Sequence, residues 1–172
     1  IVHESDLSLG LANKIASKFA KLTLTTFEKT ASTVKNAKFV GAPIREELFS
    51  KTKSQALSKY NITSNKPILL ITGGSSGAKY INEIVKKAMP QLTKNFFIFH
   101  IVGKGNLSNI KLNNYYETEF TDMAYAYKLA NVCISRAGSN TAFELLSLNI
   151  PTLFIPLPKG ASRGDQIENA NY

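Results

Sequence analysis

The sequence predicts an α/β fold with a doubly wound, mostly parallel, Rossmann-like sheet, and two observations support this expectation. Apolar runs of strand length at 67–72, 131–135 and 151–155 are each followed by a turn rich in Gly or Ser and then by a helix-like segment. Along the rest of the chain, strand-like and helix-like segments also alternate. This alternation favours parallel strands joined by right-handed crossovers, with ligands bound at the carboxyl ends of the strands.

Local patterns place the individual elements. Leu11, Ile15 and Phe19 recur on one face and predict a first helix over 7–20. Short apolar runs predict the strands, in chain order, at 22–26, 37–40, 67–72, 96–102, 115–120, 131–135 and 151–155. Longer segments that mix apolar and polar residues predict the remaining helices at 46–59, 77–93, 122–130, 140–148 and from about residue 165.

Composition narrows the class of partner. The net charge of +9 calls for an anionic partner, which is a nucleic acid, an anionic membrane or a substrate that carries a diphosphate. Between residues 14 and 38, six lysines face the single acid Glu28, which indicates a solvated basic face or a membrane-surface patch. Aromatic and basic residues do not interleave as in an RNA-binding module, so we expect no nucleic-acid partner.

Cysteine usage indicates the redox compartment of the protein, and the length of the apolar runs indicates whether a helix could span a membrane. The only cysteine, Cys133, lies in an apolar strand and predicts a buried, inert thiol, which suits a reducing cytoplasm. The longest apolar runs are of strand length, far short of the roughly 20 residues of a spanning helix.

The run from Ser135 to Glu144 is the strongest functional signal. Gly138 follows an apolar strand, where a missing side chain allows a sharp turn and close approach of a ligand. Ser139, Asn140 and Thr141 can cap the helix that follows, and its first N–H groups can face an anion. Glu144, about one turn further, can accept two hydrogen bonds from a vicinal diol such as ribose. These features together predict a nucleotide-sugar site.

The same order of strand, turn and helix recurs twice more. The strand at 67–72 ends in Gly73-Gly74-Ser75, and the strand at 151–155 is followed by a loop and helix containing Arg163 and Gln166. No Gly-Lys-Ser/Thr closes these turns, so they are not P-loops. Because the chain has no Cys/His cluster and no Asp-x-Asp pair, we expect no metal and no other cofactor.

These segments, together with His3-Glu4 and Gly41-Ala42-Pro43-Ile44-Arg45, resemble the MurG family of bacterial N-acetylglucosaminyltransferases over nearly the whole chain. The resemblance implies a two-domain GT-B fold and transfer of N-acetylglucosamine from UDP-GlcNAc to the undecaprenyl-diphosphate-linked acceptor lipid I, which forms lipid II. It also implies a peripheral enzyme at the cytoplasmic face of the cell membrane, in contact with the anionic inner membrane surface.

The resemblance implies a role for each matching residue. Arg45 and Ser75 would hold the diphosphate, and backbone groups near Thr121 would hold the uracil. Glu144 would bind the ribose, and Gln166 the hydroxyls of the GlcNAc ring. The substrate-binding residues expected in all are Arg45, Ser75, Thr121, Ser139, Asn140, Thr141, Glu144 and Gln166.

The chain departs from the family pattern at three places. Asp6 stands where the family usually has Asn, and a carboxylate would be unfavourable beside a diphosphate, although it could bond the sugar. The loop around Thr121 is one residue shorter than usual. Arg163 occupies a divergent loop and offers a second contact to phosphate.

The resemblance further implies a division into domains. Residues 1–41 would be the end of an acceptor domain, and residues 42–172 most of the UDP-GlcNAc donor domain. We expect further chain on both sides, with the general base in the acceptor domain, and an inactive enzyme without it. Three alternatives remain open: a UDP-GlcNAc 2-epimerase, a glycolipid transferase of the same fold, or a fragment that only binds nucleotide.

Overall fold

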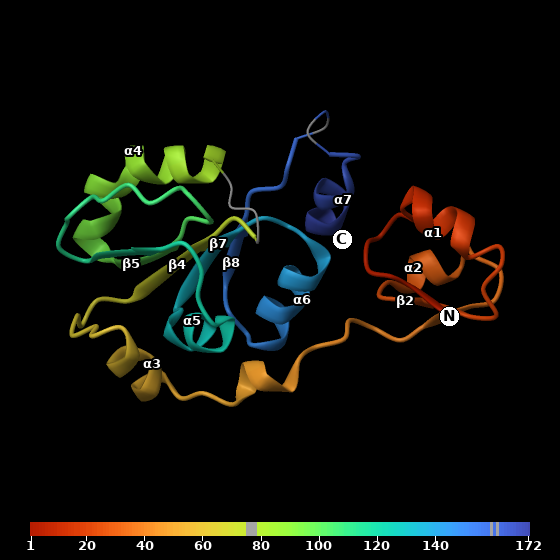
Figure 1. Cartoon of the computed structure of the whole chain (residues 1–172), viewed down its shortest axis with the longest axis horizontal. Coiled ribbons are helices and arrows are strands. Elements are labelled where there is room, and N and C mark those ends of the chain that lie inside the picture. Colours follow the sequence, from red (N-terminus) through yellow and green to blue (C-terminus); the bar gives the residue numbers. More distant parts are fainter. Residues whose placement is uncertain (75–78, 159, 161) are drawn as a thin grey trace. The chain divides into compact units, whose positions relative to one another are not determined.

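The computed structural model describes residues 1–74, 79–158, 160 and 162–172 (Figure 1). Contacts within the chain divide it into two compact units. The first unit holds residues 1–44, 137–144 and 156–172, and the second unit holds residues 45–136 and 145–155. The predicted boundary after residue 41 concerns the domains of a longer protein and stays a prediction.

The second unit is built on a five-stranded sheet in the order β6-β5-β4-β7-β8, in which every neighbouring pair is parallel. The chain therefore enters at the centre, builds outward to one edge, and returns to build the other half. This is the doubly wound arrangement, and the predicted fold class is confirmed. The strands are β4 (Ile68–Thr72), β5 (Phe97–Ile101), β6 (Tyr115–Thr118), β7 (Val132–Ser135) and β8 (Thr152–Phe154).

Burial explains why β4 lies at the centre. All five of its residues are buried, and the first four are apolar, as is typical of a parallel strand with helices on both faces of its sheet. Leu70 lies opposite Phe99 on one side and Cys133 on the other. The helical elements of this unit are η1 (Glu46–Phe49), α3 (Lys53–Lys59), α4 (Lys79–Asn95) and α5 (Met123–Leu129).

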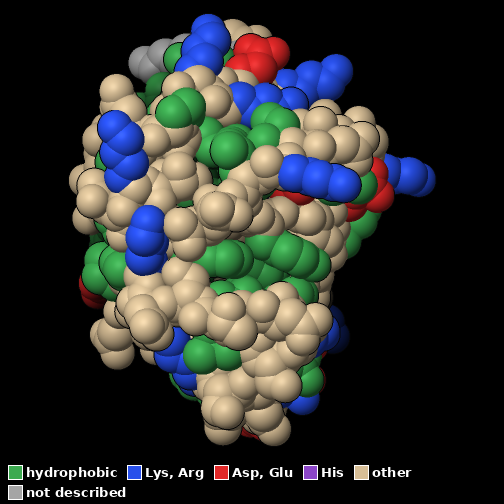
Figure 2. All heavy atoms as spheres, turned by 90° about the vertical axis from the view of Figure 1, so that its left-hand side faces the viewer, with side chains coloured by type: hydrophobic (Ala, Val, Ile, Leu, Met, Phe, Trp, Pro, Cys, Tyr) green, Lys and Arg blue, Asp and Glu red, His purple; other side chains and the backbone are tan. Residues whose placement is uncertain are grey.

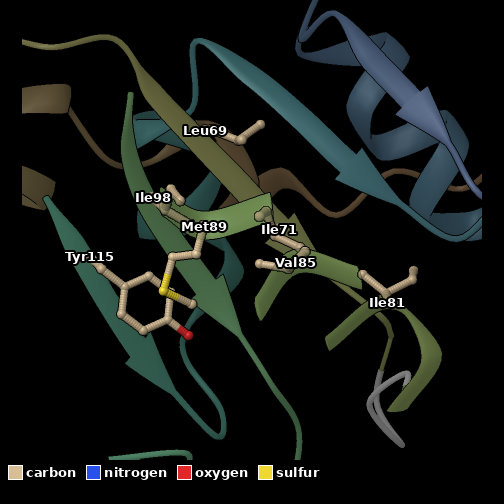
Figure 3. Close-up of a cluster of buried hydrophobic side chains, with 7 residues drawn as sticks. All are labelled: Leu69, Ile71, Ile81, Val85, Met89, Ile98 and Tyr115. Carbon is tan, nitrogen blue, oxygen red and sulfur yellow. The ribbon is translucent and has the colours of Figure 1, made fainter. Parts of the chain in front are cut away.

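The helices cover opposite faces of this sheet, with α4 on one side and α3 and α5 on the other (Figure 1). Lys and Arg side chains are spread over the side of the molecule seen in Figure 2, with few acidic ones among them. Under α4, apolar side chains of the helix and of the strands point toward one another (Figure 3). This cluster consists of Leu69, Ile71, Ile81, Val85, Met89, Ile98 and Tyr115.

The first unit holds a smaller parallel sheet in the order β1-β2-β3. Glu4, at the end of β1, is 3% exposed, and Phe27, after β2, packs edge-on against Phe143 at 5.3 Å between ring centroids. The elements of this unit are β1 (Val2–Glu4), α1 (Leu11–Ala16), β2 (Thr23–Thr25), α2 (Glu28–Ala31), β3 (Ala37–Phe39) and α7 (Asp165–Asn171). Helix α6 (Ser139–Ser147) begins in the first unit, and its last three residues belong to the second.

Several predicted boundaries were wrong. The helix expected over 7–20 covers only Leu11–Ala16, and β1 and α2 were not expected. The helix expected over 46–59 is interrupted, because Thr52 starts a new helix with a capping box. Its Oγ1 accepts a 3.2 Å bond from Gln55 N, and its own N–H donates to Gln55 Oε1 at 2.9 Å.

Candidate functional site

The turn between β7 and α6 contains the strongest predicted signal, and its residues Ala137 and Gly138 belong to the first unit. The Gly138 carbonyl accepts a 2.9 Å bond from Ala142 N, so the helix begins at Ser139, one residue earlier than expected. A side chain at Gly138 would meet no described atom within 4 Å. Packing against these atoms therefore does not require glycine here, which is compatible with the predicted close approach of a ligand.

The faces of helix α6 differ in burial. Ser139, Ala142 and Leu145 recur every three residues and are buried, whereas Asn140 is exposed and Glu144 half-buried. Asn140 and Glu144 are four residues apart and lie on the same side of the helix. Glu144 is the sixth residue of α6, beyond the first turn in which the helix dipole favours a carboxylate. The dipole alone therefore does not account for an acidic residue at this position.

Ser139 stands out among the buried polar groups. Its side chain is 4% exposed, and its hydroxyl oxygen finds no hydrogen-bond partner among the described residues. A buried hydroxyl without a partner costs free energy, and a bound ligand would supply that partner. The hydroxyl also belongs to the first residue of a nine-residue helix, where backbone N–H groups have no acceptor within the helix. Both features suit an anionic ligand.

Helix α7 carries Gln166 in the same unit. Gly164, with a φ of 90°, precedes the helix in the left-handed conformation that glycine tolerates. The side-chain oxygen of Gln166 accepts a 3.0 Å hydrogen bond from Leu157 N. This bond ties the segment before α7 to the helix, so the side-chain oxygen of Gln166 has a partner within the chain.

Arg45 and Thr121 lie in the second unit. Arg45 is exposed and immediately precedes η1. The Thr121 hydroxyl is hydrogen-bonded to the hydroxyl of Tyr60, which follows α3. The next residue, Asp122, caps α5 by accepting a 2.9 Å bond from Ala124 N. Sequence reasoning missed Tyr60, because nothing in the local pattern indicates a partner 61 residues away.

The turn after β4 is described only in part. Gly74 has a φ of 84°, a conformation that residues with a side chain rarely adopt, and its N–H donates to Thr72 Oγ1 at 3.4 Å. A glycine is therefore required at this position of the turn. Ser75, the predicted phosphate ligand, lies outside the described residues.

Comparison with known proteins identifies the family. Residues 68–172 match the family model described as the glycosyltransferase family 28 C-terminal domain. The chain belongs to this family. Among solved structures, it is similar to MurG of Acinetobacter baumannii, with a TM-score of 0.71 and 29% identity over 99% of this chain and 49% of that one. The predicted resemblance to the MurG family and its GT-B fold is thereby confirmed.

Two similar curated proteins carry the name UDP-N-acetylglucosamine--N-acetylmuramyl-(pentapeptide) pyrophosphoryl-undecaprenol N-acetylglucosamine transferase. The protein of Oceanobacillus iheyensis is 43% identical in an alignment 176 positions long, which covers 99% of this chain and 49% of the relative. A Staphylococcus aureus protein is 43% identical in an alignment 177 positions long, which covers 100% of this chain and 50% of the relative. The chain spans about half the length of the curated relatives it matches.

His100 and Cys133 both lie in the buried interior. His100 is fully buried, with Nδ1 3.1 Å from the Tyr115 hydroxyl and Nε2 3.0 Å from Asn82 Oδ1, and burial lowers its pKa to about 4. Cys133 is buried as expected, and burial raises the pKa of its thiol to about 12, so it is not a thiolate near neutral pH.

The described ranges contain neither a cluster of metal ligands nor a membrane-spanning helix. No group of three or more His, Cys, Asp or Glu side chains within residues 1–74, 79–158, 160 and 162–172 is placed to hold a metal ion. In the same part of the chain, no helix is long and apolar enough to cross a membrane.

The structure gives Arg163 partners within the chain, and its expected phosphate contact stays a prediction. The guanidinium forms a 2.8 Å ion pair with Asp6 and lies 3.7 Å from Asp165. Asp6 and Arg163 are 157 residues apart, so no sequence pattern could have paired them. The departure from the family pattern at Asp6 thus has a partner within the chain.

Proposed function

We propose that this chain forms the UDP-GlcNAc-binding part of a transferase that adds N-acetylglucosamine to lipid I and so makes lipid II. The observation that carries the proposal is the 43% identity, over 99% of the chain, to a protein whose name states this donor and this acceptor. The family 28 match over residues 68–172 supports the class of reaction.

The donor diphosphate is the group that departs when the acceptor hydroxyl attacks the anomeric carbon. Its developing charge requires donors and cations that are already in place. In the first unit, the first N–H groups of α6 and the buried Ser139 hydroxyl offer such donors. In the second unit, the exposed Arg45 offers a forked cation. Ser75, whose assignment to the diphosphate comes from the family resemblance alone, lies outside the described residues. These groups need no metal ion to act.

The rest of the donor is assigned by residue type. Glu144 would accept hydrogen bonds from both ribose hydroxyls, with Asn140 on the same side of α6 and Thr141 beside it. Gln166 would donate to hydroxyls of the GlcNAc ring. The segment at Thr121, held by Tyr60 and by the Asp122 cap, would offer backbone groups to the uracil.

We assign the acceptor and the donor to different domains of the two-domain GT-B fold. We assign residues 1–41 to the end of an acceptor-binding domain and residues 42–172 to the donor domain, with the general base outside this chain. The surroundings of the two histidines do not favour the 2-epimerase alternative. His100 is fully buried, and His3 Nε2 lies 3.3 Å from Thr26 Oγ1.

An apolar and basic surface on the first unit suits a peripheral position at the cytoplasmic face of the membrane. Leu11, Ile15 and Phe19 are 75%, 56% and 84% exposed. Beside them, Lys14 and Lys18 line an open hollow of about 480 Å³. Apolar side chains that enter the interface, flanked by lysines, match the chemistry of an anionic bilayer surface.

The test of the function is an assay of the full-length protein that contains this chain. With UDP-GlcNAc and a lipid I analogue, we expect transfer of the sugar and release of UDP. Conversion of UDP-GlcNAc to its 2-epimer without an acceptor would support the epimerase instead. Binding of the donor without either reaction would support a module that only binds nucleotide.

The membrane assignment is tested separately by sedimentation with vesicles. Binding to vesicles that contain anionic lipid should exceed binding to zwitterionic vesicles, and a K14Q/K18Q variant should lose about 1 kcal/mol per lysine removed. A K53Q/K128Q variant of the second unit, with the same loss of charge, is the control. Equal binding of all three proteins would contradict the assignment.

A further inference from the structure

Asp6 lies at the centre of a polar network within the first unit. Its Oδ2 accepts a 2.8 Å bond from the guanidinium of Arg163, and its Oδ1 accepts a 3.1 Å bond from the side-chain amide of Asn169. The Arg163 and Asp6 side chains are 39% and 22% exposed. Both oxygens of this carboxylate are therefore used within the protein.

Asn169 connects this pair to the turn before α6. Its amide NH₂ donates to Asp6 Oδ1 and, at 3.2 Å, to the carbonyl of Ala137. Its side-chain oxygen accepts a 3.2 Å bond from Leu7 N. Ala137 directly precedes Gly138 and Ser139, where the helix begins. One asparagine thus joins the segment after β1, helix α7 and the turn proposed to face the diphosphate.

A second carboxylate stabilises the same corner. Burial would raise the pKa of Glu4, but hydrogen bonds from Asn13, Gly10 N and Asp6 N, together with the charge of Arg163, outweigh it and lower the pKa. The Arg163 guanidinium lies against Gly10, since a Cβ added there would be 3.3 Å from its Nη1. Arg163 therefore sits beside three carboxylates, those of Glu4, Asp6 and Asp165.

We infer that Asp6 and Arg163 act as one positioning pair. Arg163 holds the Asp6 carboxylate on Asn169 and compensates its charge, so that Asn169 can fix the Ala137 turn and no unpaired carboxylate repels the donor diphosphate. Asp6 is then a positioning residue, not a sugar ligand, and Arg163 is not a phosphate ligand. This inference rests on the proposed function.

Calorimetry on the full-length protein with UDP-GlcNAc, UDP and uridine tests the pair. R163Q should weaken the binding of UDP-GlcNAc and of UDP about three- to tenfold, because an unpaired Asp6 repels the diphosphate. The binding of uridine, which has no phosphate, should weaken less. Adding D6N to R163Q should restore most of this loss, since the amide oxygen that D6N introduces can still accept from Asn169 without the charge. K29Q removes one exposed lysine of the same unit and should change nothing.

Each alternative has its own result. If Arg163 bound the phosphates directly, D6N would not rescue R163Q, and the inference would be overturned. If Asp6 bound the sugar, D6N alone would weaken the binding of UDP-GlcNAc but not of UDP, and this result would also overturn the inference. An equal loss of affinity for uridine would mean that the pair only stabilises the fold, which would also overturn the inference. A wild-type protein that binds none of these ligands would instead remove the proposed function.

Discussion

Asn13 donates a 3.0 Å hydrogen bond from its side-chain amide to the buried carboxylate of Glu4. The same oxygen accepts a 2.9 Å bond from Gly10 N, and the other accepts a 3.0 Å bond from Asp6 N. The His3-Glu4 motif, which sequence reasoning used only as a family mark, therefore organises the loop after β1. The ionised form of Glu4 is the one that these donors require.

Replacing Glu4 with Gln should destabilise the protein by about 2–3 kcal/mol, because an amide group would face N–H donors in a buried position. Urea unfolding at pH 7 measures this loss, with the exposed E47Q as control. Since folding lowers the pKa of Glu4, its stabilisation is present above the ordinary value of 4.5 and declines as the pH falls through the lowered pKa. A difference between E4Q and wild type that did not shrink in acid would contradict this account.

His100 should remain neutral in the folded protein down to about pH 4. Burial is the main cause, helped by the charge of Lys86 and opposed by that of Glu117. Because the unfolded chain takes up this proton near the ordinary pKa of 6.5, stability is complete above that pH and declines between 6.5 and 4. An NMR titration of the ring measures the midpoint, and a value at or above 6.5 would be inconsistent with burial as the dominant effect.

Replacing Ser139 with Ala should separate binding from stability. The hydroxyl has no partner among the described residues, so its removal should leave the unfolding midpoint unchanged or slightly raised. Affinity for UDP should fall by about 0.5–1.5 kcal/mol, the usual contribution of one hydrogen bond. Calorimetry and thermal unfolding check the two effects, with the exposed Ser147→Ala on the same helix as control. Lower stability without a change in affinity would exclude a role at the ligand.

Arg45 should matter only to ligands that carry phosphate. The R45A variant should lose about 1.5–3 kcal/mol of affinity for UDP, as expected for a charged hydrogen bond, and almost none for uridine. Parallel calorimetry with both ligands gives the answer. An equal loss for uridine would mean that Arg45 supports the fold of the second unit.

Much of the larger sheet could be predicted because its strands are buried on both faces. The apolar run of β4, which ends in Thr72, can be recognised in the sequence without knowing its neighbours in the sheet. β1 and α2 were missed because they are three and four residues long and carry polar side chains, so no periodicity develops. The interrupted helix at Thr52 was predictable in principle, since Thr52-x-x-Gln55 is a capping-box pattern.

The candidate site likewise has features that could be predicted from the sequence and features that could not. The turn and helix containing Ser139 and Glu144 are local in sequence, and both were predicted from that run alone. The contacts between Arg163 and Asp6 and between Tyr60 and Thr121 join residues far apart in the chain, so only the folded structure reveals them. The burial of Ser139, whose hydroxyl has no partner in the part of the chain that the structure describes, also depends on tertiary packing.

The most direct test of the central claim is a binding cycle on Glu144. E144Q should weaken the binding of UDP by about 1.5–3 kcal/mol, because an amide offers one accepting oxygen where the carboxylate offers two. Against 2′-deoxy-UDP the same substitution should cost clearly less, since one of the two ribose bonds is already absent. Calorimetry on wild type and E144Q with both ligands completes the cycle. A smaller penalty for the deoxy ligand places Glu144 on the ribose, whereas equal penalties would show that Glu144 does not touch the 2′-hydroxyl and would contradict the proposed donor site.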